Sequence, residues 1–287
     1  MLDRVDRVLL VVDDRPAAVA TWQQYFGAEL VGETESTTLN ARITTVRAGE
    51  TEFEFVEPIR PGPAAEFAHR WRQGLFAAGF STPDLDALES NLVENGITPI
   101  EDGDRLFIDG AQTHGMPAII SASEPRQRVG HINFVYEVTN VVPDWQKARD
   151  DYARVFGLDA SRFSYIKSDR FGYEGTLTLF NPPERLDRIE ITQTSGESAM
   201  QRFYEKRGAS LYMCYIETDD VMGLAERLNA ADAQFVHSEK RAPEAGLFIH
   251  PSSLHGMLMG VSLTNYAWVW SGRPELAGPL AAGREEH

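Results

Sequence analysis

Two strand–helix segments of similar sequence recur along the chain, and this internal repeat limits the folds open to it. AAVATWQQYFG begins at residue 17 and KARDDYARVFG at residue 147. Each places an aromatic residue four positions before a Phe-Gly pair and follows an apolar run typical of a strand. A glycine after the last apolar turn is a common helix end. The repeat therefore predicts a strand followed by a helix at two distant places.

A second pair of segments repeats in the same way. STPDLDALESNLVENGITPI (81–100) and ETDDVMGLAERLNAADAQFV (217–236) each have an acidic start and apolar residues at helical spacing. Asp84 and Asp219 are the expected N-caps of these two helices. Each helix is followed by a His-Gly turn and an apolar strand, in THGMPAII and in LHGMLMGV.

These repeats predict four modules, which start near residues 3, 74, 129 and 208. Each module consists of a strand, a helix and two or three further strands. We expect an α+β fold in which four βαβββ modules pair into two cup-shaped, mostly antiparallel sheet domains. The expected domains are 1–124 and 129–263, separated by the polar stretch EPRQR, with a tail at 264–287. Alternating Tyr266, Trp268 and Trp270 suggest that the tail forms an edge strand or a packing arm.

Composition excludes several classes of function. The chain of 287 residues carries a net charge of −16, which argues against binding to nucleic acid or to an anionic membrane surface. It has no apolar stretch long enough to span a bilayer, and its N-terminal apolar run is too short for a signal peptide. A single cysteine excludes an internal disulfide, so we expect a cytoplasmic protein.

Two strands of the third module carry polar side chains on one face. RVGHINFVYEV (128–138) is expected to form a strand in which His131 and Asn133 alternate with Ile132 and Phe134. In RIEIT, alternation places Arg188, Glu190 and Thr192 together. Such groups indicate a binding site if the fold brings both strands into one concavity. Otherwise, the polar faces are ordinary solvent-exposed surface.

The four-module layout resembles the vicinal oxygen chelate superfamily, which includes glyoxalases, methylmalonyl-CoA epimerases, bleomycin-resistance proteins, extradiol dioxygenases and hydroxyphenylpyruvate dioxygenases. VDRVLLVVDD is similar to an opening module, and FIHPSSLHGMLMGV to the closing strands of the epimerase-like branch. SGESAMQRFYEKRGASLYMCYIETDDV is similar to the corresponding link in hydroxyphenylpyruvate dioxygenases. The resemblance covers residues 3–263 and implies the fold more specifically than any reaction.

The resemblance implies that metal ligands come from the first and last strands of each module. In the C-terminal half it assigns these positions to His131, Glu190, Met213 and Gly260. Methionine and glycine cannot complete a set of two histidines and one carboxylate, so the cup either binds Fe, Mn or Zn with other ligands or binds none. In the N-terminal half the corresponding residues are Arg7, Glu54, Ala77 and Ile119, which suggests a metal-free cup with an Arg7–Glu54 ion pair.

The resemblance favours an enzyme acting on a small keto, enol or catechol-like substrate in the C-terminal cup. His131 or Glu190 would be the catalytic base for proton abstraction, isomerisation or elimination, and Asn133, Arg188 and Tyr215 would bind the substrate. A ring-cleaving extradiol-type dioxygenase is one alternative. A metal-free protein that binds or sequesters a small molecule is another, and a homodimer is compatible with all three.

Overall fold

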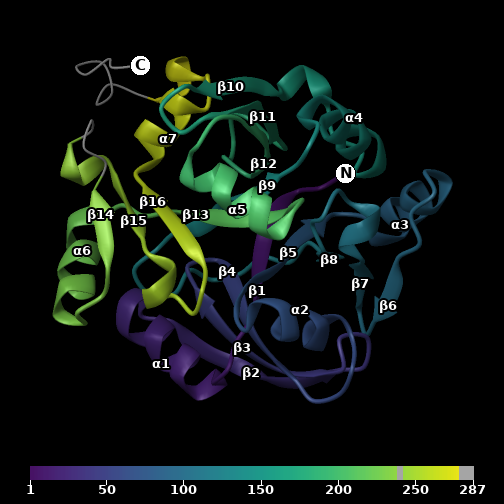
Figure 1. Cartoon of the computed structure of the whole chain (residues 1–287), viewed down its shortest axis with the longest axis horizontal. Helices are drawn as coiled ribbons and strands as arrows, with labels where there is room; N and C mark the ends of the chain where they lie inside the picture. Colours follow the sequence, from purple (N-terminus) through teal and green to yellow (C-terminus); the bar gives the residue numbers. More distant parts are fainter. Residues whose placement is uncertain (238–241, 278–287) are drawn as a thin grey trace. The chain divides into compact units, whose positions relative to one another are not determined.

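The computed structural model describes residues 1–237 and 242–277, and it confirms the four-module α+β organisation (Figure 1). Every module consists of one strand, one helix and three further strands, in that order. Module 1 comprises β1 (Arg4–Val11), α1 (Arg15–Phe26), β2 (Glu29–Ser36), β3 (Ala41–Ala48) and β4 (Thr51–Pro58), followed by α2 (Pro63–Trp71). Module 2 comprises β5 (Gly74–Thr82), α3 (Leu85–Glu94), β6 (Ile100–Asp102), β7 (Arg105–Ile108) and β8 (Ala118–Ala122).

The second half of the chain repeats this order. Module 3 comprises β9 (Phe134–Val141), α4 (Trp145–Val155), β10 (Ser164–Ser168), β11 (Tyr173–Leu179) and β12 (Arg188–Thr194), followed by α5 (Ala199–Arg207). Module 4 comprises β13 (Ser210–Glu217), α6 (Val221–Ala230), β14 (Phe235–His237), β15 (Gly246–Ile249) and β16 (Leu258–Ser262), followed by α7 (Thr264–Trp270). Short 3-10 turns lie at Gly110–Gln112, Ala160–Arg162, Pro243–Ala245, Pro251–Ser253 and Pro274–Leu276.

The strands form two eight-stranded sheets with equivalent topology. Their strand orders are β2-β3-β4-β1-β5-β8-β7-β6 and β10-β11-β12-β9-β13-β16-β15-β14. In every module the first strand pairs in parallel with the last, as in β1–β4 and β9–β12, while the other pairings within a module are antiparallel. This parallel pair carries the positions to which the resemblance assigns metal ligands.

An aspartate caps the N-terminus of the helix in each module. The side chains of Asp14, Asp84, Asp144 and Asp220 each accept a hydrogen bond from the backbone N–H three residues further on. This interaction satisfies a donor that the helix itself leaves without a partner. Asp84 is confirmed as a cap. The expectation for Asp219 is wrong, because the cap is the next residue, Asp220, and the Asp219 carboxylate accepts from Asn133 and Arg128.

Two further expectations were wrong. The strand expected at 128–138 begins only at Phe134, because residues 128–133 form a bridge and turn that bond elsewhere: Gly49 and Val129 exchange backbone hydrogen bonds, and the His131 N–H donates to Phe26. Of the two alternatives for the tail, the edge strand is wrong, because Thr264–Trp270 form helix α7, on which Trp268 is buried. In the described residues, no helix has the length and apolar character needed to cross a membrane.

Two compact units can be distinguished, and each combines modules from the two halves of the sequence. The first contains residues 1–6, 76–125 and 137–212, and therefore most of modules 2 and 3. The second contains residues 7–75, 126–136 and the chain from Met213 onward, and therefore most of modules 1 and 4. The domain boundary at 124–128 remains a prediction.

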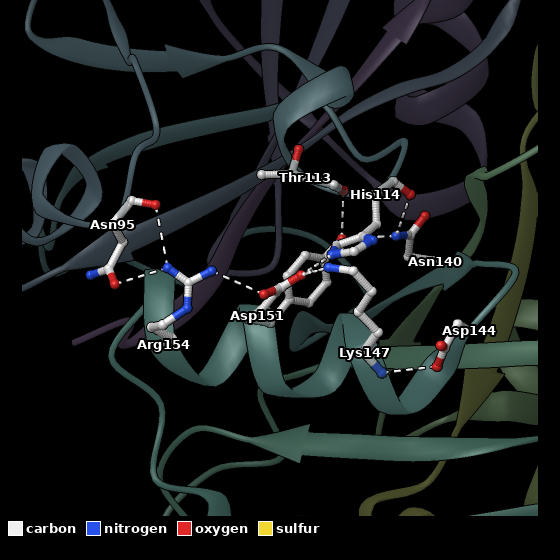
Figure 2. Close-up of polar contacts among 9 residues, drawn as sticks. Asn95, Thr113, His114, Asn140, Asp144, Lys147, Asp151 and Arg154 are labelled. Carbon is white, nitrogen blue, oxygen red and sulfur yellow. Dashed lines mark hydrogen bonds and ion pairs between the residues drawn. The ribbon is translucent and has the colours of Figure 1, made fainter.

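The first His-Gly turn explains why modules 2 and 3 pack together. His114 Nε2 lies 2.9 Å from Asp151 Oδ2 on α4, and the His114 carbonyl accepts from Asn140 Nδ2 at 3.1 Å (Figure 2). Tyr152 Oη, also on α4, donates to the Thr113 carbonyl at 2.7 Å. The turn of one module is thus held by the helix and first strand of the next.

The second His-Gly turn makes the equivalent contact in the other unit. His255 Nε2 lies 3.1 Å from Thr21 Oγ1 on α1, and its ring packs 6.2 Å from that of Trp22. Trp22 and Tyr152 hold the same place in the repeated stretches at 17–27 and 147–157. The repeated aromatic residue therefore serves as the support for a His-Gly turn.

We predict that Gly115→Ala destabilises the protein more than a left-handed backbone alone would explain. Gly115 has φ +84°, and an added Cβ would lie 2.0 Å from the Ala209 carbonyl oxygen. Gly103 is the matched control, because its φ is +73° but nothing lies within 4 Å of its added Cβ. Gly103→Ala should cost about 1–2 kcal/mol of unfolding free energy in a denaturant titration. An equal cost for both variants would contradict the close approach.

Candidate functional site

The capping aspartates define equivalent positions on the first strands. The residue seven positions before the cap is Arg7, Ala77, Glu137 and Met213 in modules 1 to 4. The residue two positions later on the strand pairs with Glu54, Ile119, Glu190 and Gly260 on the last strands. The expected last-strand positions and three of the four first-strand positions are therefore mutually equivalent.

The exception is His131, whose expected strand position was wrong. Glu137 occupies the position equivalent to Arg7, and His131 lies in the turn before β9 with an exposed side chain. Its carbonyl accepts from Thr218, and its pKa is lowered by partial burial and by nearby Arg227. His131 also belongs to the unit that does not contain Glu190. His131 therefore does not occupy the strand position from which its expected role as a ligand was inferred.

Glu190 lies in a buried polar group that we call the acid cluster, made of Glu137 and Thr139 on β9 and Arg188 and Glu190 on β12. Arg188 Nε donates to Glu137 Oε2 at 2.6 Å, and Thr139 Oγ1 donates to Glu190 Oε2 at 3.2 Å. Thr139, Arg188 and Glu137 are at most 1% exposed, whereas Glu190 is 8% exposed. Glu190 is therefore the least buried member.

Strand alternation determines which way this cluster points. Asn140, the next residue after Thr139, donates to Tyr152 on α4, so the side chain of Asn140 faces that helix. Neighbouring residues on a strand point to opposite faces, which turns the acid cluster away from α4. The apolar Ile189 and Ile191 alternate with Arg188 and Glu190, as the sequence predicts.

The electrostatics of the cluster raise the pKa of Glu190. Burial raises the pKa of Glu190 well above its ordinary value, and the adjacent Glu137 carboxylate and a hydrogen bond to it raise the pKa further. Arg188 and the Thr139 hydroxyl act in the opposite direction but do not outweigh burial. Burial and the charge of Glu190 also raise the pKa of Tyr212, at the start of β13.

The three expected substrate-binding residues occupy different surroundings. Arg188 belongs to the acid cluster beside Glu190. Asn133 is buried in the second unit, where its Nδ2 donates to Glu217 Oε1 at 2.7 Å and to Asp219 Oδ1 at 3.0 Å. Its contacts hold the chain before β9 against the end of β13. Tyr215, on β13, lies in an aromatic group of module 4.

The ring of Tyr215 covers the last-strand position of module 4. A Cβ added to Gly260 would lie 2.1 Å from Tyr215 Cε1. Tyr215 also stacks on Tyr136 with ring centroids 5.9 Å apart and meets Phe248 edge-on at 5.7 Å. An aromatic surface therefore stands where modules 1 and 3 have a glutamate.

In module 1 the expected Arg7–Glu54 ion pair is confirmed. Arg7 Nη1 lies 2.8 Å from Glu54 Oε1, and both side chains are almost fully buried. Glu52 joins them at 3.7 Å from Arg7 and also pairs with Arg47 and Arg126. Arg126, from the polar stretch between the two halves, keeps only 8% of its side chain exposed.

Sequence comparison then determines the family. The model of the Glyoxalase/Bleomycin resistance protein/Dioxygenase superfamily matches residues 4–125 and 128–258. The chain belongs to this superfamily. A search of curated proteins gave no match.

Solved structures share the fold of this superfamily member at low sequence identity. A mutant of 4-hydroxymandelate synthase from Streptomyces coelicolor superposes with a TM-score of 0.71 at 12% identity, covering 96% of this chain and 98% of that one. A fusion of a xylose isomerase-like TIM barrel with 4-hydroxyphenylpyruvate dioxygenase gives a TM-score of 0.58 at 10% identity, covering 99% of this chain and 53% of that one. At such identities the likeness concerns the fold.

The residues at the metal-bearing positions do not fit a metal ion. Glu137 is bound to a guanidinium, Met213 is a weak thioether donor, and Gly260 has no side chain, so Glu190 is the remaining donor at these four positions. Among the described residues, no group of three or more His, Cys, Asp or Glu side chains could hold a metal.

The roles of two residues, Glu137 and Arg126, could not be predicted from residue type alone. Glu137 lies in the apolar stretch NFVYEV and is recognisable only by its distance from the capping aspartate. Arg126 lies in a polar stretch that has the composition of a linker, and nothing in its sequence indicates burial. A groove of about 550 Å³ lies elsewhere on module 3, lined by polar residues of the β10–β11 turn and of the segment 195–198. It contains none of the predicted site residues.

We predict that Glu190→Gln removes part of the pH dependence of stability. Because folding raises the pKa of Glu190 above its ordinary value of 4.5, its contribution is greatest below that pH and is lost as the pH rises. The wild type should therefore lose melting temperature relative to Glu190→Gln between acidic and neutral pH. Thermal melts across this range measure the difference. A wild type that gains stability over the variant as pH rises would contradict a raised pKa.

We predict a strong energetic coupling between Arg7 and Glu54. Arg7→Met leaves a buried carboxylate without its partner and should cost about 3–5 kcal/mol, while Arg7→Met with Glu54→Leu should recover much of that loss. Arg60→Met is the control, because Arg60 and Glu35 form an exposed pair at 3.8 Å whose loss should cost about 0–1 kcal/mol. Additive shifts in a denaturation cycle would contradict the coupling.

Proposed function

We propose that this protein is an enzyme that moves a proton on a small keto, enol or catechol-like substrate at the acid cluster of module 3. Glu190 is the proposed catalytic residue. The observation that carries the proposal is a carboxyl group at a family ligand position, 8% exposed and bounded by a second carboxyl group. Superfamily membership supports an enzyme but names no reaction.

The surroundings of Glu190 suit proton transfer near neutral pH. General acid–base catalysis works best when the pKa of the catalytic group is close to the operating pH, and burial beside a carboxylate shifts the pKa of Glu190 in that direction. Thr139 fixes one carboxyl oxygen by donating to it. Arg188, bound to Glu137, acts as a positioning residue, because only 1% of its surface is exposed.

The simplest reaction compatible with this group is an isomerisation without net redox change. In its ionised form Glu190 takes a proton from the carbon next to a carbonyl, and the electrons of that C–H bond pass into an enolate. The resulting carboxylic acid then returns the proton to the same or a different atom of the substrate. This sequence balances protons and electrons without a co-reactant.

Dioxygenase activity is the alternative suggested by the names of the similar structures, 4-hydroxymandelate synthase and a 4-hydroxyphenylpyruvate dioxygenase fusion. Both likenesses lie below 25% identity. Because the donor set at the ligand positions does not fit iron, we derive no oxygen-dependent step for this chain.

Binding without turnover is the second candidate function. The specific observation that favours it is the aromatic group around Tyr215 in module 4, since aromatic side chains provide large contact areas for ligands. A binding protein would saturate with its ligand but would not accelerate proton exchange. Measurement of turnover therefore separates the two candidates.

We predict that the protein accelerates keto–enol interconversion of benzoylacetone, a neutral diketone, in the presence of EDTA. Glu190→Gln should lower the rate by about 10²–10⁴-fold, because an amide cannot exchange the proton. Glu174→Gln is the control, since Glu174 is an exposed residue of β11. Ultraviolet absorbance of the enol follows the reaction. An unchanged rate in Glu190→Gln would contradict the proposed function.

A further inference from the structure

Three neighbouring strands of module 4 bring two aromatic rings to either side of a glycine. Tyr215 on β13 pairs with Gly260 on β16, and Gly260 pairs with Phe248 on β15. Directly paired residues lie on the same face of a sheet. Tyr215, Gly260 and Phe248 therefore form one row, which we call the aromatic row.

The backbone at Gly260 does not require glycine. It is absent from the left-handed glycines of the described chain, and the equivalent positions in the other modules carry Glu54, Ile119 and Glu190. What Gly260 supplies is space, because Tyr215 Cε1, Cδ1 and Cζ lie 2.1–2.4 Å from where its Cβ would be. The ring therefore rests against the glycine backbone.

Further aromatic residues adjoin the row. Tyr136 stacks on Tyr215 with an interplanar angle of 27°, and its hydroxyl group lies 2.8 Å from Ser262 Oγ, two residues beyond Gly260 on β16. Trp270 of α7 lies 6.5 Å from Tyr215. Tyr136 is fully buried, whereas Tyr215, Phe248 and Trp270 remain partly exposed. The group thus has a rigid base and an accessible surface.

The pair of side chains that precedes the row on β13 and β16 is apolar. Met213 pairs with Leu258, one pleat before Tyr215 and Gly260, and Met213 is 5% exposed. Thioethers pack favourably against aromatic rings. Glu217, at the far end of β13, is engaged by Asn133. A flat, uncharged group of a ligand therefore matches the aromatic row better than an ionic group does.

We propose that the aromatic row of module 4 is a stacking site that binds a flat, uncharged ring of the ligand, at the positions where the family pattern calls for metal ligands. Where the family pattern calls for metal ligands, Met213 and Gly260 supply no strong donor, and Tyr215 and Phe248 supply a stacking surface instead. The inference goes beyond the proposed function: the stacking site lies in the second unit and does not require catalysis at Glu190.

A matched pair of ligands tests the site. Benzoylacetone carries a flat phenyl ring, and its cyclohexyl analogue has the same diketone with a puckered ring of similar size. Isothermal titration with EDTA present should show benzoylacetone binding about two- to tenfold more tightly, as expected for one additional aromatic contact.

Substitutions in the row should remove this preference. Phe248→Leu and Tyr215→Leu keep apolar volume but lose a ring, so both ligands should bind with similar affinity. Phe248→Leu protects the test against misfolding, because Phe248 is partly exposed. Tyr165→Leu, at an exposed aromatic residue of module 3, is the control and should keep the wild-type preference.

The outcomes separate this site from the proposed function. Equal binding of the two ligands to the wild type, or a preference that survives both row substitutions, would overturn the stacking site. A preference that is lost in the row variants, in a protein that does not accelerate benzoylacetone enolisation, would support the stacking site and reject the catalytic proposal. Glu190→Gln should keep the ligand preference.

Discussion

In each module the first strand pairs in parallel with the last, and this pairing places two side chains next to each other on the face turned away from the helix. The capping aspartate lies seven residues after the first-strand position in every module. The four modules then differ mainly in what occupies these positions. Module 1 has an ion pair, module 3 an acid cluster, and module 4 an aromatic row.

Modules 1 and 3 carry opposite charges at equivalent positions, and the exchange changes the surroundings of the glutamate on the last strand. Arg7 forms an ion pair with Glu54. The equivalent residue, Glu137, lies beside Glu190 and forms an ion pair with Arg188. A guanidinium stabilises an ionised carboxyl group, and a neighbouring carboxylate destabilises it. The same backbone arrangement thus carries an ion pair in module 1 and a carboxyl group with a raised pKa in module 3.

The repeats suffice to predict the four-module fold, whereas the Arg7–Glu54 pair and the ligand position of Glu190 follow from the family resemblance. Alternation alone misplaces His131, because a shift of six residues along a strand preserves which face each side chain takes. The distance to the capping Asp144 would have identified Glu137. Neither the burial of Arg126 nor the contact of Tyr215 with Gly260 follows from local pattern, since both depend on which segments fold together.

The central claim is that burial beside Glu137 raises the pKa of Glu190 above its ordinary value. Infrared spectroscopy measures this directly, because the C=O stretching band of a carboxylic acid is distinct from the bands of a carboxylate. As the pH rises above the ordinary glutamate pKa of 4.5, the wild type should keep a carboxylic-acid band that is absent in Glu190→Gln and still present in Glu174→Gln. A wild-type spectrum without that band, or one in which Glu190→Gln leaves it unchanged, would contradict the account.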